Sequence, residues 1–228
     1  LRDSVVGAEA AAGRPLEEMY APAVDVLVAL STEPPPENLP VEGFAPYRLP
    51  TYSRDALLTE ALLIVDWFWP ALHGGPAPAT LRDEFIELWT PLLEEASGHE
   101  RGLILRDFHS PNLMWLPERQ GLQRVGLLDF QDALCGPSAY DLVSLLQDAR
   151  LDVPEALEAK LLARYCAARA AKDGQFSSEQ FRVLYATLGA QRNSKILGIF
   201  ARLAKRDGKR AYLTHIPRVA RYLWRDLA

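Results

Sequence analysis

The chain has 228 residues, of which 49% are hydrophobic and 24% charged, and its formal net charge is −5. This balance is typical of a globular protein of one domain or two small ones, and it excludes a disordered tail, a coiled coil and a strongly basic nucleic-acid binder. The most apolar stretch, residues 61–69, is shorter than the ~20 residues that cross a bilayer, and two cysteines are too few for a disulfide framework. We therefore expect a cytoplasmic protein with no membrane or nucleic-acid partner.

The predicted elements are mostly helices. Apolar residues at helical spacing predict a first helix over residues 14–30, and the six prolines of residues 33–51 predict an extended surface segment. Ser53 is a predicted N-cap for a second helix that runs to about Leu72, and Thr80 with Asp83 predicts a cap for a third. Further along the chain we expect a strand over 102–105, a hairpin within 112–130, and helices that start at residues 138, 154, 177 and near 217.

Unusual chemistry is concentrated in the strand-rich part. The segment Leu105-Arg-Asp-Phe-His-Ser-Pro-Asn-Leu113 carries an acid, a histidine and an amide, and its lack of periodicity predicts a loop. The two flanks of Pro-Glu-Arg-Gln-Gly predict a β-hairpin with Gly121 in the turn. If the turn is centred between residues 120 and 121, Asn112 lies opposite Asp129. The hairpin then brings both side chains to one end, beside the loop that carries Asp107.

Two carboxylates and an amide oxygen that converge would repel each other without a cation. Oxygen ligands of this kind suit Mg²⁺, which usually binds through one or two carboxylates, water and substrate phosphates. Asp107 is then available to accept a proton from an attacking hydroxyl group. These parts are those of phosphoryl transfer, in which positioning and charge neutralisation supply most of the catalysis.

Three motifs carry a resemblance to a known family. The loop Arg106 to Asn112, with Asp followed five residues later by Asn, resembles the catalytic loop of protein-kinase-like enzymes. Asp129-Phe-Gln-Asp132 resembles their metal-binding Asp-Phe-Gly, and Ala139-Tyr-Asp-Leu142 resembles a helix start of aminoglycoside phosphotransferases and choline kinases. The wider text, including residues 189–202, is most similar to the anomeric kinases of N-acetylmuramate and N-acetylglucosamine, which act in cell-wall recycling.

The resemblance implies roles for five residues. Asp107 is the expected catalytic base, Asn112 and Asp129 are the expected Mg²⁺ ligands, and Asp141 is expected to support the catalytic loop by hydrogen bonds to its backbone. Arg106 is expected to support the loop as well. One alternative is open for Asp141, which together with Ser138 has the spacing of a helix cap.

The sequence departs from the family pattern at two positions. Leu105 stands where the family usually has histidine, so we expect packing to be kept and a hydrogen bond lost. Gln131 replaces the glycine of Asp-Phe-Gly, which predicts a fixed loop. His109 is a further candidate metal ligand, with local packing or hydrogen bonding as the alternative.

Two motifs that a kinase of this type carries upstream of its catalytic loop are not found in this sequence. A kinase of this type needs a glycine-rich loop and a strand lysine upstream of the catalytic loop, yet Lys160 is the first lysine in the chain. We therefore expect residues 1–228 to form the C-terminal lobe of a kinase-like phosphotransferase, without its N-terminal nucleotide-binding lobe. The fold class is α+β and mostly helical, with a small β-hairpin insert that carries the catalytic and metal residues. The expected cofactors are Mg²⁺ and ATP, whose site needs the missing lobe.

The acceptor is expected to bind helical inserts of this lobe. The candidates are aromatic, acidic, basic and amide side chains suited to a sugar ring and its hydroxyl groups: Glu60, Asp66, Trp67, Arg192 and Asn193. Trp67 has a core position as its alternative, and Arg192 with Lys195, three residues further on, has a solvated helix face as its own.

The predicted function is ATP-dependent phosphoryl transfer to a sugar hydroxyl, the anomeric one of N-acetylmuramate or N-acetylglucosamine. The fragment by itself is expected to be inactive. Three alternatives remain: an aminoglycoside or choline-type kinase, a non-catalytic binding module derived from the fold, and a metal hydrolase built on Asp107, His109 and Asp129.

Overall fold

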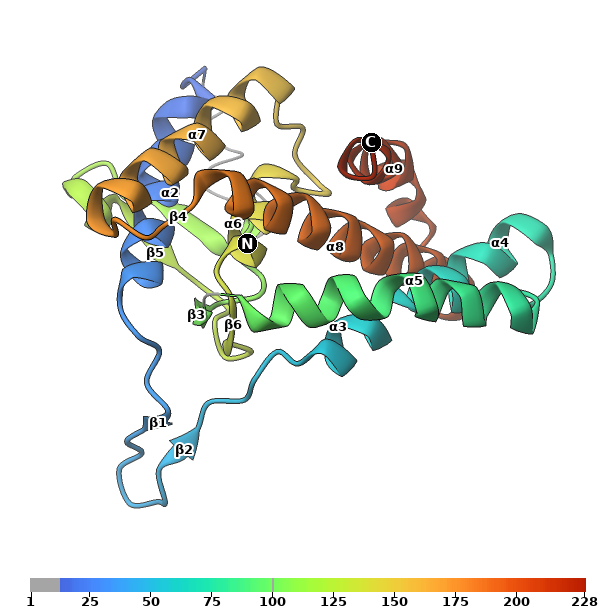
Figure 1. The fold of residues 1–228 in the computed structure, drawn as a ribbon. Helices are drawn as coiled ribbons and strands as arrows, with labels where there is room; N and C mark the ends of the chain where they lie inside the picture. The colour runs from blue at the N-terminus through green and yellow to red at the C-terminus, as the bar shows by residue number, and fades with distance from the viewer. Residues whose placement is uncertain (1–12, 100) are drawn as a thin grey trace. The chain divides into compact units, whose positions relative to one another are not determined.

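The structure is a computed structural model that describes residues 13–99 and 101–228. The chain divides into two compact units. Of the described residues, unit 1 contains 13–51 and 101–182, and unit 2 contains Tyr52–His99 and Val183–Ala228. Figure 1 shows helices as the main elements of both units, as the sequence predicts, with three short two-stranded sheets in unit 1.

Among the residues of unit 1 that the structure describes, the helices are α2 (Leu16–Thr32), α6 (Ala139–Leu146) and α7 (Glu155–Lys172), with the first residues of α8 (Ser178–Arg206). Its strands and short helical turns are β1 (Asn38–Leu39), β2 (Tyr47–Arg48), β3 (Arg101–Ile104), η2 (Ser110–Asn112), β4 (Leu113–Trp115), η3 (Gly121–Arg124), β5 (Val125–Leu127) and β6 (Leu134–Pro137). Strands pair in the antiparallel orders β1–β2, β3–β6 and β4–β5.

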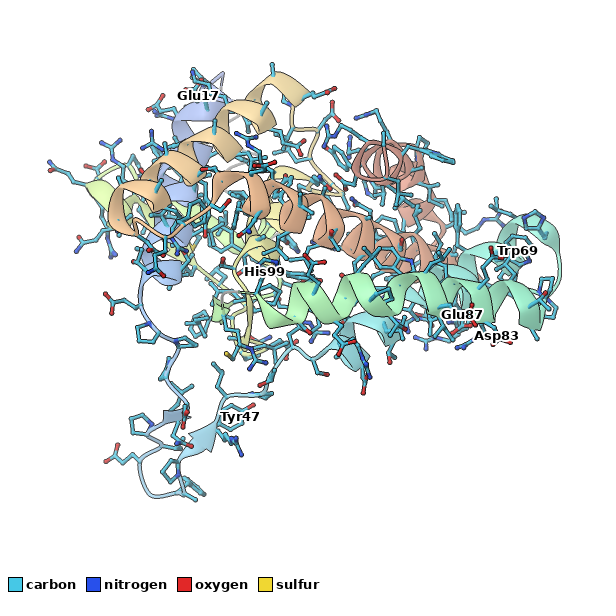
Figure 2. The ribbon with its side chains drawn as sticks, viewed as in Figure 1. Glu17, Tyr47, Trp69, Asp83, Glu87 and His99 are labelled. Atoms are coloured by element: carbon cyan, nitrogen blue, oxygen red, sulfur yellow. The ribbon has the colours of Figure 1, made fainter. Side chains whose placement is uncertain are left out.

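Helix α2 follows the predicted helix over residues 14–30 to within two residues at each end. Its apolar side is buried and contacts α7, β3 and η3. Salt bridges from Lys160 to Glu17 and from Arg164 to Asp25, both with a shortest N–O distance of 2.7 Å, connect α7 to α2 at the rim of this contact. The proline-rich segment that follows is mainly exposed, and this includes the β1–β2 pair, where Tyr47 is labelled in Figure 2.

Unit 2 is helical. It contains α3 (Arg54–Ala61), a π-helical turn η1 (Ile64–Phe68), α4 (Trp69–His73), α5 (Ala79–Gly98), most of α8, η4 (Arg210–His215) and α9 (Ile216–Asp226). The α8 backbone passes close to the preceding helical run, because a Cβ atom at Gly198 would overlap the backbone of Leu63. Figure 2 labels Asp83 and Glu87 on α5 and Trp69 at the start of α4.

The predicted helix over 53–72 is interrupted. Ser53 caps it as predicted, because its hydroxyl oxygen accepts a hydrogen bond from the amide of Ala56 at 3.3 Å. The interruption is the π turn, in which the amide of Trp69 donates to the carbonyl of Ile64, five residues back. Pro70 has no N–H and its ring would collide with the carbonyl four residues before it, so the backbone must widen there.

The second predicted helix cap, at Thr80, is wrong. The predicted cap at Thr80 lies inside α5, which begins at Ala79, and its N-cap residue Pro78 makes no side-chain cap bond. A proline at this position presets the backbone dihedral that starts a helix and removes the need for one donor.

The helical run Arg54–His73 has 20 residues and is therefore longer than the apolar stretch of residues 61–69 from which the sequence analysis excluded a membrane span. By length and composition alone, it is one helical run among the described residues that could cross a membrane, and 22% of its most apolar window is buried. Core helices of soluble proteins have the same properties, so the run carries no membrane assignment.

Candidate functional site

The loop that follows β3 is held at its beginning by Asp141. The carboxylate of Asp141 on α6 accepts hydrogen bonds from the amides of Leu105 and Arg106, at 2.6 and 2.8 Å. Asp141 is buried, and the loop amides that it binds turn inward. Ser138, the alternative partner for a helix cap, makes no side-chain cap bond at the start of α6. The carboxylate is therefore bound to the loop backbone, as loop support requires.

The loop has an unusual backbone conformation at the residue before Asp107. Arg106 has a φ of 70° and Asp129 has a φ of 58°, and both belong to the left-handed region that non-glycine residues rarely adopt. Among the described residues these are the non-glycine positions with positive φ. Such strain concentrates at functional sites because the surrounding structure must hold it in place.

Asp107 and Asn112 are connected through the loop itself. The side-chain amide of Asn112 donates to the backbone carbonyl of Asp107 at 3.0 Å, and the amide of His109 donates to the same carbonyl at 3.0 Å. Both Asp107 and Asn112 are half-buried. Because the nitrogen of the Asn112 side chain is turned to the loop, its oxygen remains as the atom that can bind a cation.

The predicted hairpin is present, but its register differs by one residue. Leu113 pairs with Leu127, and the amide of Leu128 donates to the carbonyl of Asn112 at 2.9 Å. Asn112 therefore lies opposite Leu128, and Asp129 follows one position later. The predicted turn centre is wrong because the connection contains the helical turn η3, which begins at Gly121. Strand β5 ends at Leu127, two residues before the left-handed backbone of Asp129.

Two of the candidate residues, Asp129 and His109, have side-chain contacts with their neighbours. Gln131 donates from its side-chain amide to the carboxylate of Asp129 at 2.5 Å, so the residue that replaces the family glycine contacts the expected metal ligand. Leu105 is buried, as the packing prediction requires. His109 is also buried, and its Nε2 atom lies 3.3 Å from the guanidinium of Arg150.

Asp148 contacts the loop and is absent from the sequence predictions. This carboxylate, 1% exposed, accepts from the amide and the hydroxyl group of Ser110 at 3.0 and 2.7 Å. Burial of a carboxylate costs free energy unless hydrogen bonds or opposite charges compensate for it. The burial of Asp148 therefore depends on its bonds to Ser110. The available signal was an aspartate two residues after the strongly apolar run of α6.

The donor set can be compared with the needs of a metal. Among the described residues there is no cluster of three or more His, Cys, Asp or Glu side chains that could hold a metal ion. This disfavours the metal hydrolase built on Asp107, His109 and Asp129. One carboxylate and one amide oxygen, from Asp129 and Asn112, are hard ligands that fit a Mg²⁺ ion whose other ligands are phosphate oxygens and water.

The acceptor candidates lie in unit 2, where Glu60 is at the centre of a polar cluster. Lys195 pairs with Glu60 at 2.9 Å, and the Tyr52 hydroxyl donates a short hydrogen bond to the same carboxylate. The side chains of Glu60 and Lys195 are each 14% exposed. Gln191, one turn before Lys195 on α8, donates to the carbonyl of Leu57 at 2.9 Å. The cluster therefore holds α3 against α8.

The other acceptor candidates have different surroundings. Asp66 is exposed and pairs with Arg82 at 3.5 Å, and Trp67 is half-buried in the π turn rather than a full member of the core. Arg192 is 6% exposed, and Asn193 is fully buried and donates to Asp226 at 3.2 Å. The alternative of a solvated face is therefore wrong for Arg192 and for Lys195.

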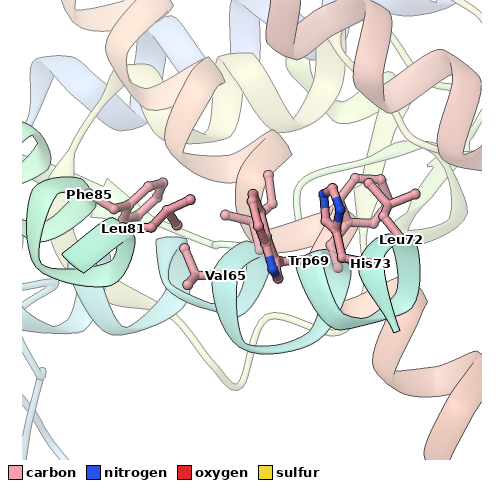
Figure 3. Close-up of a pocket in the computed structure, with 8 residues that line it drawn as sticks. Val65, Trp69, Leu72, His73, Leu81 and Phe85 are labelled. Carbon is pink, nitrogen blue, oxygen red and sulfur yellow. The ribbon is translucent and has the colours of Figure 1, made fainter. Parts of the chain in front are cut away.

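Unit 2 also contains apolar pockets. Figure 3 shows one of about 310 Å³ between the helical run 64–73 and α5, in which the rings of Trp69 and His73 lie 4.0 Å apart. A second pocket, of about 640 Å³, is lined by α5, α8 and α9 and includes Trp89 and Asp226. Both are mainly apolar, so a sugar would find few hydrogen-bond partners in them.

Comparison with known proteins identifies the family. Residues 4–175 match the phosphotransferase enzyme family, which is more than half of the chain. The chain belongs to this family.

Curated relatives share the same description. The chain is 40% identical over 212 residues to an N-acetylmuramate/N-acetylglucosamine kinase of Caulobacter vibrioides, a match that covers 93% of this chain and 57% of the relative. It is 37% identical over 179 residues to the enzyme of the same description from Neisseria meningitidis, covering 78% of this chain and 52% of that protein. The chain thus spans about half the length of the curated relatives it matches.

Two solved structures are similar in three dimensions. They are the choline kinase LicA of Streptococcus pneumoniae, with a TM-score of 0.49, 13% identity and coverage of 91% of this chain and 64% of that one, and a microcompartment-associated aminopropanol kinase, with a TM-score of 0.42, 16% identity and coverage of 93% and 83%. Both TM-scores lie below 0.5, so family membership rests on the sequence.

Proposed function

We propose that this chain is the C-terminal lobe of an ATP-dependent kinase that phosphorylates the anomeric hydroxyl group of N-acetylmuramate or N-acetylglucosamine. The observation that carries the proposal is the loop from Leu105 to Asn112, whose backbone is bound by Asp141 and closed by Asn112 on the carbonyl of Asp107. Family membership and the names of the relatives support the reaction and the sugar. A reaction that consumes ATP fits a cytoplasmic protein.

In this proposal Asp107 is the general base. Its carboxylate accepts the proton of the acceptor hydroxyl while the oxygen forms a bond to the γ-phosphorus of ATP and the bond to ADP breaks. The backbone of Asp107 is fixed on both sides, because its amide donates to Leu105 and its carbonyl accepts from His109 and Asn112. A fixed base has little freedom to lose when the acceptor binds.

Asn112 and Asp129 are the proposed Mg²⁺ ligands. When bound, the ion neutralises charge on the transferring phosphoryl group. Gln131 holds one carboxylate oxygen of Asp129, and the Asp107 carbonyl holds the nitrogen of the Asn112 side chain. Asp141 and Arg106 support the loop.

The proposed acceptor contacts are less uniform. Asp66 and Trp67 offer an exposed carboxylate and a half-buried aromatic ring, which suit a sugar hydroxyl and a sugar face. We propose an indirect, supporting role at the acceptor site for Glu60, Arg192 and Asn193, because their polar atoms are largely buried within unit 2.

The test uses the full-length protein that contains this chain. It is mixed with ATP, Mg²⁺ and either amino sugar, and the products are followed by phosphorus NMR. A new anomeric phosphate signal, abolished by Asp107→Asn, is the expected result. ATP consumption with kanamycin or choline, but not with either sugar, would replace the acceptor class. No turnover with any acceptor would favour a binding module.

A further inference from the structure

We propose that Asp148 is a positioning residue for the catalytic loop, and that it holds the half of the loop that Asp141 does not reach. The inference rests on the proposed function, because the loop matters through Asp107 and Asn112. Asp141 binds the amides of residues 105 and 106, and Asp148 binds Ser110. The five-residue interval between Arg106 and Asn112 is thus held near both of its ends.

The two oxygens of Asp148 have separate partners. One oxygen accepts from the amide and the hydroxyl group of Ser110, at 3.0 and 2.7 Å. The other accepts from the amides of Arg150 and Leu151, at 2.7 and 3.3 Å. The carboxylate therefore connects the catalytic loop to the backbone that follows α6. An amide side chain has a single oxygen, so asparagine would leave one of these two sets of donors unpaired.

Ser110 transmits the position of Asp148 to a proposed metal ligand. It is the first residue of the helical turn η2, and the last residue of that turn is Asn112. The turn is closed by the amide of Asn112 on the carbonyl of His109, at 2.9 Å. A shift of Ser110 therefore moves the Asn112 side chain and its bond to the Asp107 carbonyl.

A second contact acts in the same direction. The guanidinium of Arg150, two residues after Asp148, lies 3.3 Å from the Nε2 atom of His109. The backbone after α6 thus reaches two consecutive loop residues, one through a carboxylate and one through a side-chain contact. Because Ser110 and Asp148 are both buried, their contact is shielded from water, which would otherwise compete for it, whereas the Arg150 contact is only partly buried.

The first experiment compares two neutralised carboxylates in the full-length protein. Asp148→Asn neutralises the carboxylate that binds the loop and leaves one of its two sets of donors unpaired, whereas Glu158→Gln neutralises another buried acid of unit 1, which accepts from Gln147. We expect kcat to fall about 10- to 100-fold for Asp148→Asn, because small misplacements of reacting groups cost up to ~100-fold. The KM for the sugar should stay within about twofold, and Glu158→Gln should keep nearly the original kcat. Equal losses of kcat in both variants would overturn the proposal.

Ser110→Ala separates the loop contact from the rest of Asp148. It removes the 2.7 Å bond from the Ser110 hydroxyl group and leaves the Arg150 and Leu151 amides paired. We expect a smaller fall in kcat, of about 3- to 10-fold, and the double variant should be no slower than Asp148→Asn because the Ser110 hydroxyl group acts through its bond to Asp148. Multiplicative losses would contradict this coupling. If Asp148→Asn does not fold, Ser110→Ala alone decides, and an unchanged kcat refutes the proposal.

A measurement on the loop itself distinguishes this inference from the proposed function. Hydrogen exchange of the amides of residues 105–112 requires no substrate. We expect Asp148→Asn to accelerate exchange at residues 109, 110 and 112 at least tenfold over the rest of unit 1, and Glu158→Gln to leave these amides unchanged. Uniform acceleration throughout unit 1 would indicate a purely structural role and reject the inference. An inactive wild-type protein with this local exchange pattern would refute the proposed function only.

Discussion

Three carboxylates, two in unit 1 and one in unit 2, show two different uses of an acidic residue. In unit 1, Asp141 and Asp148 are buried and accept hydrogen bonds from backbone amides of a loop. In unit 2, Glu60 is bound by the side chains of Lys195 and Tyr52, and it connects two helices. A carboxylate bound to amides fixes the shape of a backbone, whereas a carboxylate bound to an ammonium group fixes the distance between elements. The first use is typical of a reaction site and the second of a scaffold.

The largest expected effect is a loss of activity from a substitution in the loop of unit 1. Asp107→Asn in the full-length protein should lower kcat by about 100- to 10,000-fold, the usual contribution of a general base. Its unfolding free energy should change little, because the Asp107 contacts described here use its backbone. Turnover and denaturant unfolding, measured on the same preparation, check both parts. A variant that keeps its activity would remove Asp107 from the mechanism.

The next effect concerns the loop backbone. Asp141→Asn retains one acceptor oxygen for two amides, so one of the amides of Leu105 and Arg106 is left unpaired. An unsatisfied buried donor costs about 1–3 kcal/mol of unfolding free energy. Urea unfolding should show this loss together with a fall in kcat. A loss of stability at unchanged kcat would show that the loop does not depend on Asp141.

Breaking the pair in unit 2 should affect stability rather than chemistry. Lys195→Met leaves Glu60 half-buried without its ammonium partner, and we expect about 2 kcal/mol of lost unfolding free energy, below the 3–5 kcal/mol of a fully buried pair. Adding Glu60→Gln should restore most of the loss. Thermal unfolding of the single and double variants tests this, and additive losses would argue against the pairing.

A smaller effect is expected at the start of α3. Ser53→Ala removes the oxygen that accepts from the Ala56 amide, and it should cost about 0.5–1 kcal/mol of unfolding free energy. Thr80→Ala is the matched control, because Thr80 lies within α5 and is not its N-cap residue. Equal losses in both variants would mean that Ser53 is not the effective cap.

The smallest predicted difference is between two thiols. Burial raises the pKa of the Cys166 thiol, so less thiolate is present at neutral pH, whereas Cys135 is partly exposed. Iodoacetamide at pH 7.5 should therefore modify Cys135 before Cys166, as read by mass spectrometry of peptides. Raising the pH should narrow the difference, because the fraction of Cys166 thiolate then increases.

The sequence predicts the presence of helices and strands better than it predicts strand register and helix ends. The helix α2 follows from the spacing of its apolar residues, and the hairpin follows from two apolar runs around Gly121. The register is wrong by one residue because a nine-residue connection leaves several turn centres open, and the helical turn η3 decides among them. The false cap at Thr80 has a similar origin, since the capping pattern contains no information about the proline that precedes the helix.

The candidate site is predictable where spacing carries it. Asp107, Asn112 and Asp141 belong to motifs whose residues are at fixed distances along the chain, and their contacts with the loop follow those motifs. Asp148 is missed because its partner, Ser110, is 38 residues away and neither residue type is rare. The burial of Glu60, Arg192 and Asn193 depends on tertiary packing, which local patterns do not contain.

The π turn at Ile64–Phe68 has a consequence for the alignment of side chains along unit 2. A π turn behaves as one extra residue within an α-helix, and one residue corresponds to a rotation of about 100°. Everything after the turn, including Trp69 and His73 in the pocket of Figure 3, is therefore rotated relative to α3. Deleting a single residue between 64 and 68 would rotate both rings by about 100° relative to α3, so the number of residues in this turn sets the direction in which the pocket opens.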